Sequence, residues 1–248
     1  MYLDWRTQEV AIAAALSGDP ALQAAYRTGD VYHVLARDSG LTNDPEPKHW
    51  KDANPSTRQR MKALQLGIIY GIGVPSLARG LDRHPLIASD LMERHRRVYP
   101  GFWQWREDQV RVAMLKRCIE SVFGWPLHIG TSPNKRTLYN YPMQANGAEM
   151  LRLAACRLCE IGIVPCMLVH DGILLELESK EQIIAAIDVM RWAGKEVCDG
   201  FEVGVDIDQL LEGGARYRDK RPVAKKLWAT IMDALATVGA IPRKAALP

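Results

Sequence analysis

The stretch VPCMLVHDGILLELE, residues 164–178, decides the fold of this chain. Two apolar arms flank His170, Asp171 and Gly172, and an Asp-Gly step between such arms is typical of a tight turn joining two antiparallel strands. Because the arms are buried, the turn residues must face a cleft or solvent. Asp171 is therefore either an ordinary turn residue or a carboxylate presented at a site, and His170 either a polar neighbour of the turn or part of that site.

A second carboxylate has a comparable place near the N-terminus. In LDWRTQE, residues 3–9, Asp4 lies at the end of a strand predicted over residues 1–5 and before an alanine-rich helix. A carboxylate at a strand end is well placed to bind a metal ion, because the strand fixes the backbone and the side chain projects into open space. The alternative is that Asp4 caps the helix, which is the commoner role of an acidic residue there.

One predicted helix carries a stripe of cations that ends in an aromatic residue. In RQRMKALQLGIIYG, residues 58–71, the side chains of Arg58, Lys62, Leu66 and Tyr70 are spaced by four and share a face. The cations lie near the helix N-terminus, which adds a partial positive charge. Such a stripe suits a polyphosphate with a base packed further along. A solvated basic face is the alternative.

The composition is that of a globular protein. The chain has 248 residues, 48% apolar and 25% charged, which excludes a disordered or fibrous chain and allows one or two domains. No apolar run approaches the ~20 residues of a membrane helix. The net charge of +3 is concentrated in a basic tail, because eight Lys and Arg but only two Asp lie in residues 216–248. The pattern of elements predicts an α+β chain, rich in helices, with few strands.

Two further segments give local expectations. Residues 28–55 are polar and rich in turn residues, and within them TNDPEPKHW, residues 42–50, is predicted to be a loop. Cys156 and Cys159 form a CxxC inside an apolar helical pattern, and no second CxxC or pair of histidines follows. We therefore expect buried helical thiols rather than a metal site. The five cysteines and the lack of a leader-like opening favour a reducing compartment.

The order of these features resembles the polymerase region of family A DNA polymerases. Residues 4–33 resemble motif A and its continuation, residues 58–71 resemble the motif B helix, and residues 167–172 resemble motif C. Between the last two, RTLYNYPMQANGAEML, residues 136–151, resembles the segment that contacts primer and template. The resemblance runs from residue 2 to about residue 209, and four motifs in order make it highly specific.

The resemblance implies a metal-dependent nucleotidyl transfer. Asp4 and Asp171 resemble the two metal carboxylates of the family, and the backbone carbonyl of Trp5 is a further expected ligand. The implied cofactor is a pair of Mg²⁺ ions, which would activate the primer 3′-hydroxyl and hold the triphosphate. Lys62 matches a cation that can protonate the pyrophosphate leaving group.

The resemblance also implies the substrate contacts. The residues expected at the nucleotide are Arg58, Lys62, Leu66, Tyr70, Glu9 and His33. Arg58 and Lys62 would bind the triphosphate, and Glu9 would crowd the sugar 2′ position to favour deoxynucleotides. The residues expected at the primer–template DNA are Arg136, Asn140, Gln144 and His170.

Two residues depart from the family pattern. Gly172 stands where the family usually has a glutamate after His-Asp, which removes an accessory carboxylate but leaves Asp171. Leu66 stands where an aromatic residue usually packs beside the nucleotide sugar. We expect an active site with altered metal handling and altered sugar discrimination.

The implied fold is the palm and fingers of a right-hand polymerase with a small antiparallel palm sheet. The expected domains are palm over residues 1–30, fingers over 31–125 with the motif B helix at 56–71, palm over 126–210 and a basic extension over 211–248. The thumb, the palm upstream of motif A and an exonuclease domain are expected to be absent. A separate chain supplying thumb and upstream palm is then an expected partner, and a sheet edge or apolar face should be uncovered near Tyr2 and Leu3.

The expected function is DNA-directed DNA polymerase activity on primer–template DNA and dNTPs, by a fragment or one part of a split enzyme. One alternative is a catalytically impaired subunit that binds nucleic acid or assembles with a partner. A single-subunit RNA polymerase is another, against which Glu9 and the sequence QLGIIYG argue. The basic tail helix can lie on DNA, dock a partner or remain solvated. We expect no membrane contact and a place in the cytoplasm of a bacterial cell or a phage-infected host.

Overall fold

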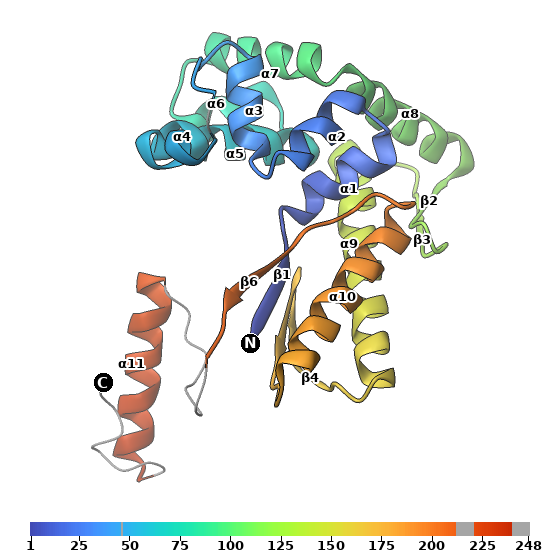
Figure 1. The fold of residues 1–248 in the computed structure, drawn as a ribbon. Helices are drawn as coiled ribbons and strands as arrows, with labels where there is room; N and C mark the ends of the chain where they lie inside the picture. Colours follow the sequence, from blue (N-terminus) through green and yellow to red (C-terminus); the bar gives the residue numbers. More distant parts are fainter. Residues whose placement is uncertain (46, 212–220, 240–248) are drawn as a thin grey trace. The chain divides into compact units, whose positions relative to one another are not determined.

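The computed structural model describes residues 1–45, 47–211 and 221–239 (Figure 1). Residues 2–207 form one compact unit, and Met1 with the described residues from Asp208 onward forms a second. We describe each unit by itself. In the described part of the chain no helix is long and apolar enough to cross a membrane.

The larger unit contains a four-stranded antiparallel sheet. Its strands, in spatial order, are β4 (Pro165–Val169), β5 (Gly172–Leu175), β1 (Tyr2–Trp5) and β6 (Val205–Gln209). The predicted hairpin around residues 170–172 is confirmed as β4 and β5, and the predicted N-terminal strand as β1. The strand predicted over residues 202–206 begins three residues later.

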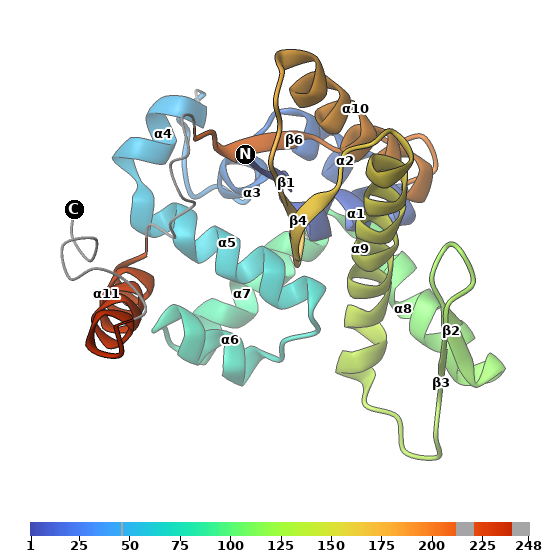
Figure 2. The ribbon, with the colours of Figure 1, turned by 90° about the horizontal axis from the view of Figure 1, so that it is seen from below.

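Helices pack against one side of this sheet and extend beyond it. In chain order they are α1 (Gln8–Ser17), α2 (Pro20–Arg27), α3 (Val31–Asp38), α4 (Pro47–Ala53), α5 (Pro55–Ile69), α6 (Val74–Leu81), α7 (Pro85–Val98), α8 (Pro100–Lys116), α9 (Lys135–Glu160) and α10 (Lys180–Val197). Figure 2 shows α5, α6 and α7 grouped together, with the hairpin of β2 (Cys118–Glu120) and β3 (Pro126–His128) on the other side of α9.

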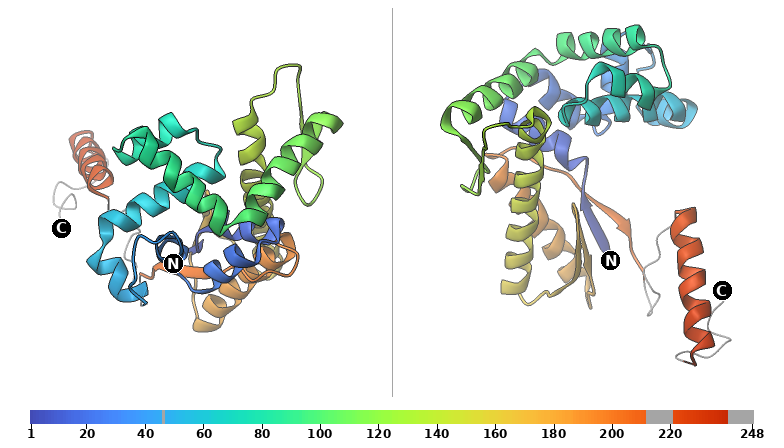
Figure 3. Two further views of the ribbon diagram at one scale, coloured as in Figure 1. Left: turned by 90° about the horizontal axis from the view of Figure 1, so that it is seen from above. Right: turned by 180° about the vertical axis from the view of Figure 1, so that it is seen from behind.

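The sheet has one covered face and one open face. Leu3, Ile173 and Leu175 are at most 2% exposed, and α9 and α10 run along this side of the strands (Figure 3). Because side chains alternate along a strand, the residues between them point to the opposite face. Asp4 and Gly172, which face each other in the ladder, belong to that open face.

The uncovered edge predicted near Tyr2 and Leu3 is wrong. The strand β1 lies inside the sheet between β5 and β6, and Leu3 is fully buried. In this sheet, exposed apolar side chains lie instead on the edge strand β4, where Met167, Leu168 and Val169 are 55%, 45% and 43% exposed. The chain order could not show this, because which strand forms an edge depends on long-range pairing.

The loop predicted over residues 42–50 is wrong at its end, because α4 begins at Pro47, and the polar segment before it contains α3. The carboxylate of Asp30 begins α3 by accepting hydrogen bonds from the backbone N–H groups of Tyr32 and His33. The helix α4 carries Trp50, which is only 1% exposed. Capping and one anchoring aromatic residue outweigh the polar composition of the segment.

The helix predicted over residues 143–161 starts eight residues earlier than expected. Asn134 caps α9 by accepting from the N–H of Arg136, and Pro142 is accommodated inside the helix. The expected burial of Cys156 and Cys159 is wrong, since both thiols are exposed on α9. The buried residues of this part of the helix are Met150, Ala154 and Leu158, which define a different stripe.

In the second unit the tail contains α11 (Pro222–Thr237), close to the helix predicted there. Its side chains Val223, Leu227 and Ile231 are exposed at a spacing of four. Six of the tail residues that carry its charge lie outside the described residues: Arg216, Arg218, Asp219, Lys220, Arg243 and Lys244.

Candidate active site

The two carboxylates predicted from the sequence lie at one end of the sheet, Asp4 on β1 and Asp171 in the turn that joins β4 to β5. Asp4 is the partner of Gly172 in the antiparallel ladder of β1 and β5. The backbone N–H of Trp5 donates to the carbonyl oxygen of Asp171 at 3.1 Å, which closes the ladder at the hairpin turn. The residue that caps α1 is Thr7 and not Asp4. The alternative reading of Asp4 as a helix cap is therefore wrong.

Trp5 fixes the end of β1 against the covered side of the sheet. Its indole is 1% exposed, and its Nε1 donates to the carbonyl oxygen of Met190 in α10 at 2.9 Å. The side chain thus points away from the face that carries Asp4. Any contact of Trp5 with a ligand on that face has to come from its main chain.

His170 lies at the turn in a left-handed backbone conformation, with φ 54°. Its Nδ1 is 3.4 Å from Oδ1 of Asp171, and the two side chains are 56% and 33% exposed. Both groups are accessible at the end of the hairpin. The turn therefore presents its polar residues outward. Of the two arms expected to be buried, β5 is mostly buried and β4 is exposed.

Glu9 and Tyr70 join α1 to the end of α5. The Tyr70 hydroxyl donates a short hydrogen bond to Oε1 of Glu9. Burial, this hydrogen bond and the negative charges of Glu9 and Asp171 all raise the pKa of Tyr70. The hydrogen bond to Glu9 ties the aromatic end of the predicted stripe to α1.

The cationic end of the stripe meets α3. Nε of Arg58 is 3.0 Å from Oδ2 of Asp30, and the guanidinium carbon lies 5.1 Å from the ring centroid of Tyr32. Burial raises the pKa of Tyr32 to about 12 against the opposing effect of Arg58. Lys62, one turn further along α5, is exposed. Leu66, the next residue of the stripe, is half-buried.

The sequence did not single out Asp30 or Tyr32. The available signal was the Gly29-Asp30 step before the apolar segment that starts at Val31, a pattern typical of a helix start. His33, the residue that was singled out, is only 1% exposed. Its Nε2 is 2.7 Å from the carbonyl oxygen of Asp44, and its ring lies 5.2 Å from that of Trp50. The backbone N–H of His33 donates to the Asp30 carboxylate that also accepts from Arg58, while the imidazole of His33 is buried.

The residues predicted to contact DNA lie on α9 and at the hairpin. Arg136 and Gln144 are exposed and Asn140 is half-buried, and their spacing of four puts them on one face of the helix. A methyl group built on Gly71 would lie 2.6 Å from Cδ2 of Tyr139. The first turns of α9 are therefore in close contact with the end of the motif B helix.

A buried arginine ties these two helices to α8. Arg106 donates to the carbonyl oxygen of Ile68 at 2.8 Å. Its guanidinium carbon lies 3.8 Å from the ring centroid of Tyr139 and 4.7 Å from that of Trp103. Trp103 in turn donates to Nδ1 of the buried His95 at 3.0 Å. No sequence pattern pointed to this network, because its members are scattered over four helices.

The donor set at the open face fits hard divalent cations. The carboxylate of Asp4 on β1, that of Asp171 in the hairpin turn and the main chain at Trp5 offer oxygen ligands, which Mg²⁺ prefers together with substrate phosphates. Within the described ranges no group of three or more His, Cys, Asp or Glu side chains could hold a metal ion. A metal ion held by Asp4 and Asp171 would therefore need further oxygen ligands from elsewhere.

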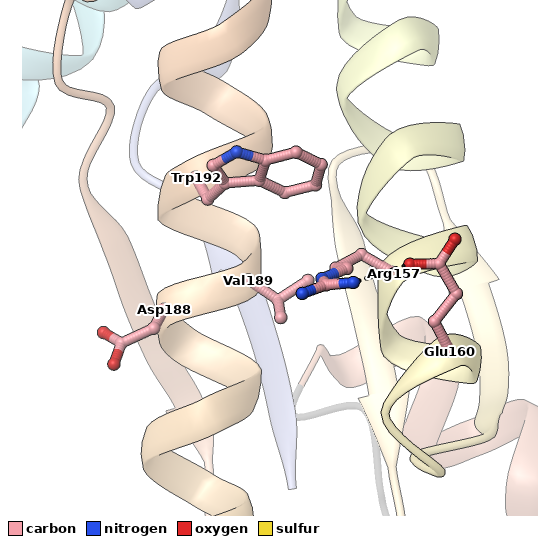
Figure 4. A pocket seen from close by; sticks show the side chains of 5 residues that line it. All are labelled: Arg157, Glu160, Asp188, Val189 and Trp192. Atoms are coloured by element: carbon pink, nitrogen blue, oxygen red, sulfur yellow. Dashed lines mark hydrogen bonds and ion pairs between the residues drawn. The ribbon is translucent and has the colours of Figure 1, made fainter.

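A pocket of about 400 Å³ lies between α9 and α10 (Figure 4). Its lining residues are Arg157, Glu160, Asp188, Val189 and Trp192. None of them is a predicted site residue. The two helices that form the pocket cover the side of the sheet away from Asp4, so the pocket is separate from the carboxylate site.

Comparisons with known proteins agree with this arrangement. The family model for DNA polymerase family A matches residues 1–208. The chain is 26% identical over 197 residues to DNA polymerase I of Rhizobium leguminosarum, covering 72% of this chain and 19% of that protein. It is 26% identical over 202 residues to the DNA polymerase of Mycobacterium phage D29, covering 79% and 31%. The chain thus spans between about a fifth and a third of the length of these relatives.

A solved structure shows the same fold. The chain is similar to the POL domain of Pol1 from M. smegmatis, in complex with DNA primer-template and dNTP, with a TM-score of 0.67, 24% identity, and coverage of 82% of this chain and 38% of that one. The helix-rich unit with its small antiparallel sheet therefore has the fold of a polymerase palm and fingers region. With a family model that matches most of its length, the chain belongs to DNA polymerase family A.

Proposed function

We propose that the chain is the palm and fingers part of a DNA-directed DNA polymerase that adds dNTPs to a primer 3′-hydroxyl. The observation that supports the proposal is the ladder of β1 and β5, in which Asp4 is opposite Gly172 and the N–H of Trp5 donates to the carbonyl oxygen of Asp171 in the turn before β5. In this proposal residues 1–30 and 126–210 belong to the palm, residues 31–125 to the fingers and residues 211–248 to an extension. Its relatives are bacterial and phage polymerases, so its place is the cytoplasm of a bacterial or phage-infected cell.

Asp4, Asp171 and the main-chain carbonyl of Trp5 would hold two Mg²⁺ ions. Such ions lower the pKa of an attacking hydroxyl and neutralise the charge of a triphosphate. The open face of the sheet leaves room for substrate oxygens. The buried indole of Trp5 would keep the end of β1, and with it the main-chain carbonyl of Trp5, fixed beside such ions.

The α5 stripe would bind the nucleotide. Arg58 and Lys62 are one turn apart, and Lys62 is exposed, so its ammonium group can reach a triphosphate and give a proton to the leaving pyrophosphate. Glu9, held by the Tyr70 hydroxyl, is a rigid group that would crowd a ribose 2′-hydroxyl. Leu66 would pack beside the sugar, and His33 would contact the phosphates.

DNA would lie along α9 and the hairpin. Arg136, Asn140 and Gln144 offer one cation and two amides on one helix face, and His170 is exposed beside Asp171. The similar M. smegmatis domain is described in complex with primer-template and dNTP, which supports the same ligands here. The formal net charge of +3 gives little long-range attraction to DNA.

Efficient synthesis would need the rest of the palm and a thumb, which we propose come from a separate chain. The exposed apolar side chains of the edge strand β4 support this part of the proposal. A catalytically impaired assembly subunit is the second candidate. One observation favours it, because Gly172 supplies no carboxylate beside Asp171.

Primer extension tests the proposal. The 248-residue chain is assayed with primer–template, dNTPs and Mg²⁺, alone and with a polypeptide that carries a thumb and the remaining palm. We expect weak, salt-sensitive extension by the chain alone, a large increase with the second polypeptide, and none with the Asp171→Asn variant in either assay. Unimpaired DNA binding without extension in both assays would favour the assembly subunit.

A further inference from the structure

Gly172 is buried although it follows an exposed turn. A methyl group built on its Cα would lie 2.2 Å from the hydroxyl oxygen of Tyr2, 2.4 Å from its Cζ and 3.0 Å from the carbonyl oxygen of Leu3. Non-bonded atoms do not approach so closely. The phenol of Tyr2 therefore occupies the space that any side chain at position 172 would fill.

This phenol is on the open face of the sheet. In the ladder of β1 and β5, Tyr2 is opposite Leu174 and Asp4 is opposite Gly172, so these four residues share one face. Tyr2 and Asp4 are two positions apart on the same strand. The ring of Tyr2 reaches diagonally to Gly172, which brings the hydroxyl to the end of the ladder where Asp4 and Asp171 lie.

We propose that Tyr2 is a positioning residue of the two-carboxylate site, and that its hydroxyl forms an outer-shell hydrogen bond to the carboxylate of Asp4. Gly172 is required at its position because only a residue without Cβ leaves the hydroxyl this place. The inference rests on the proposed function, because it gives Tyr2 a role in holding a divalent ion.

The chemistry of a metal site explains why such a group matters. Two neighbouring carboxylates repel each other and need fixed orientations to share an ion. Hydrogen bonds to ligating carboxylates fix their orientation, and loss of an outer-shell partner typically weakens metal affinity by about 10–100-fold. A phenol hydroxyl is neutral at physiological pH, so it orients Asp4 without adding a third negative charge.

The test is a titration of the full 248-residue chain with Mn²⁺ alone, followed by the electron paramagnetic resonance of the free ion. We expect Tyr2→Phe to weaken Mn²⁺ binding about tenfold, the lower end of outer-shell effects, with no change in melting temperature. Gly172→Ala should displace the ring and weaken binding to a similar degree. The double variant should bind Mn²⁺ no more weakly than the weaker-binding single variant, because both changes remove the same interaction.

A matched control removes a different phenol hydroxyl. Tyr141 donates to the carbonyl oxygen of Trp125 away from the sheet, so Tyr141→Phe should leave Mn²⁺ binding unchanged. Wild-type affinity in Tyr2→Phe, together with strong loss in Asp171→Asn, would overturn the role of Tyr2 alone. If Asp171→Asn also binds Mn²⁺ like wild type, the carboxylate site itself is refuted and the role of Tyr2 with it.

Discussion

The hydroxyl of Tyr70 donates to the carboxylate of Glu9, which joins the end of the motif B helix to the first helix of the chain. The pair connects the stripe that would bind the nucleotide with α1, the helix that follows the strand carrying Asp4. In the proposed function, a carboxylate held in this way would resist moving aside for a larger sugar. Sugar selection should then depend on both residues.

Glu9→Ala should admit ribonucleotides. Removal of the side chain opens the space at the sugar 2′ position and leaves the Tyr70 hydroxyl without its acceptor. The measurement is the ratio of incorporation efficiencies for a dNTP and the matching rNTP, which should fall at least about tenfold, the effect of a 1.4 kcal/mol loss of discrimination. Glu9→Gln, which keeps the size, is the control. Unchanged selectivity in Glu9→Ala would remove Glu9 from this role.

Lys62→Ala should impair nucleotide use far more than DNA binding. Lys62 is exposed on the stripe of α5 and would face the triphosphate rather than the duplex. We expect a rise in KM for dNTP and a fall in kcat, with primer–template affinity within about twofold of wild type, a difference of ~0.4 kcal/mol. Arg60→Ala removes an equal charge from another face of α5 and serves as the control. Equal losses of nucleotide use and DNA affinity in Lys62→Ala would indicate a DNA-contact face.

Arg106→Ala should destabilise the fold strongly. The change leaves a cavity between the rings of Trp103 and Tyr139 and removes the donor to the carbonyl of Ile68. We expect a loss of about 2–4 kcal/mol in the free energy of unfolding, measured in urea. Arg111→Ala, at an exposed ion pair with Asp108, should cost less than about 1 kcal/mol. Similar costs for the two variants would contradict the structural role of Arg106.

Acid should destabilise the protein through His95. Burial lowers the pKa of His95 to about 3, so the folded state keeps it neutral while the unfolded state takes up a proton below about pH 6.5. The contribution of neutral His95 to the free energy of unfolding is therefore complete above pH 6.5. It is lost as pH falls toward 3, by about 1.4 kcal/mol per pH unit. Urea unfolding between pH 7 and pH 5 should show this slope, and His95→Gln should reduce it. An unaltered slope in the variant would assign the acid sensitivity to other groups.

Local patterns predicted much of this fold. The Asp-Gly turn between apolar arms gave the hairpin of β4 and β5, and the spacing of four gave the face of α5 that carries Arg58 and Lys62. These features depend on residues close in sequence. They fix turn geometry and helix periodicity whatever the rest of the chain does.

The errors arose where long-range packing decides the structure. The position of β1 inside the sheet and the exposure of Cys156 and Cys159 depend on partners far along the chain. The contact of Tyr2 with Gly172 is of the same kind, because a diagonal neighbour across two strands has no signature in either segment. The family resemblance marked Gly172 as unusual, but only the structure gives a physical reason for it.

The central claim is that Asp4 and Asp171 share a divalent ion. Fe²⁺ bound in place of Mg²⁺ generates hydroxyl radicals with ascorbate and peroxide, and these cut the backbone next to the ion. Mass spectrometry of the fragments should find cuts near both residue 4 and residue 171, and Asp4→Asn or Asp171→Asn should each abolish both cuts. If each variant removes only the cut beside its own position, the two carboxylates bind ions separately and the account is wrong.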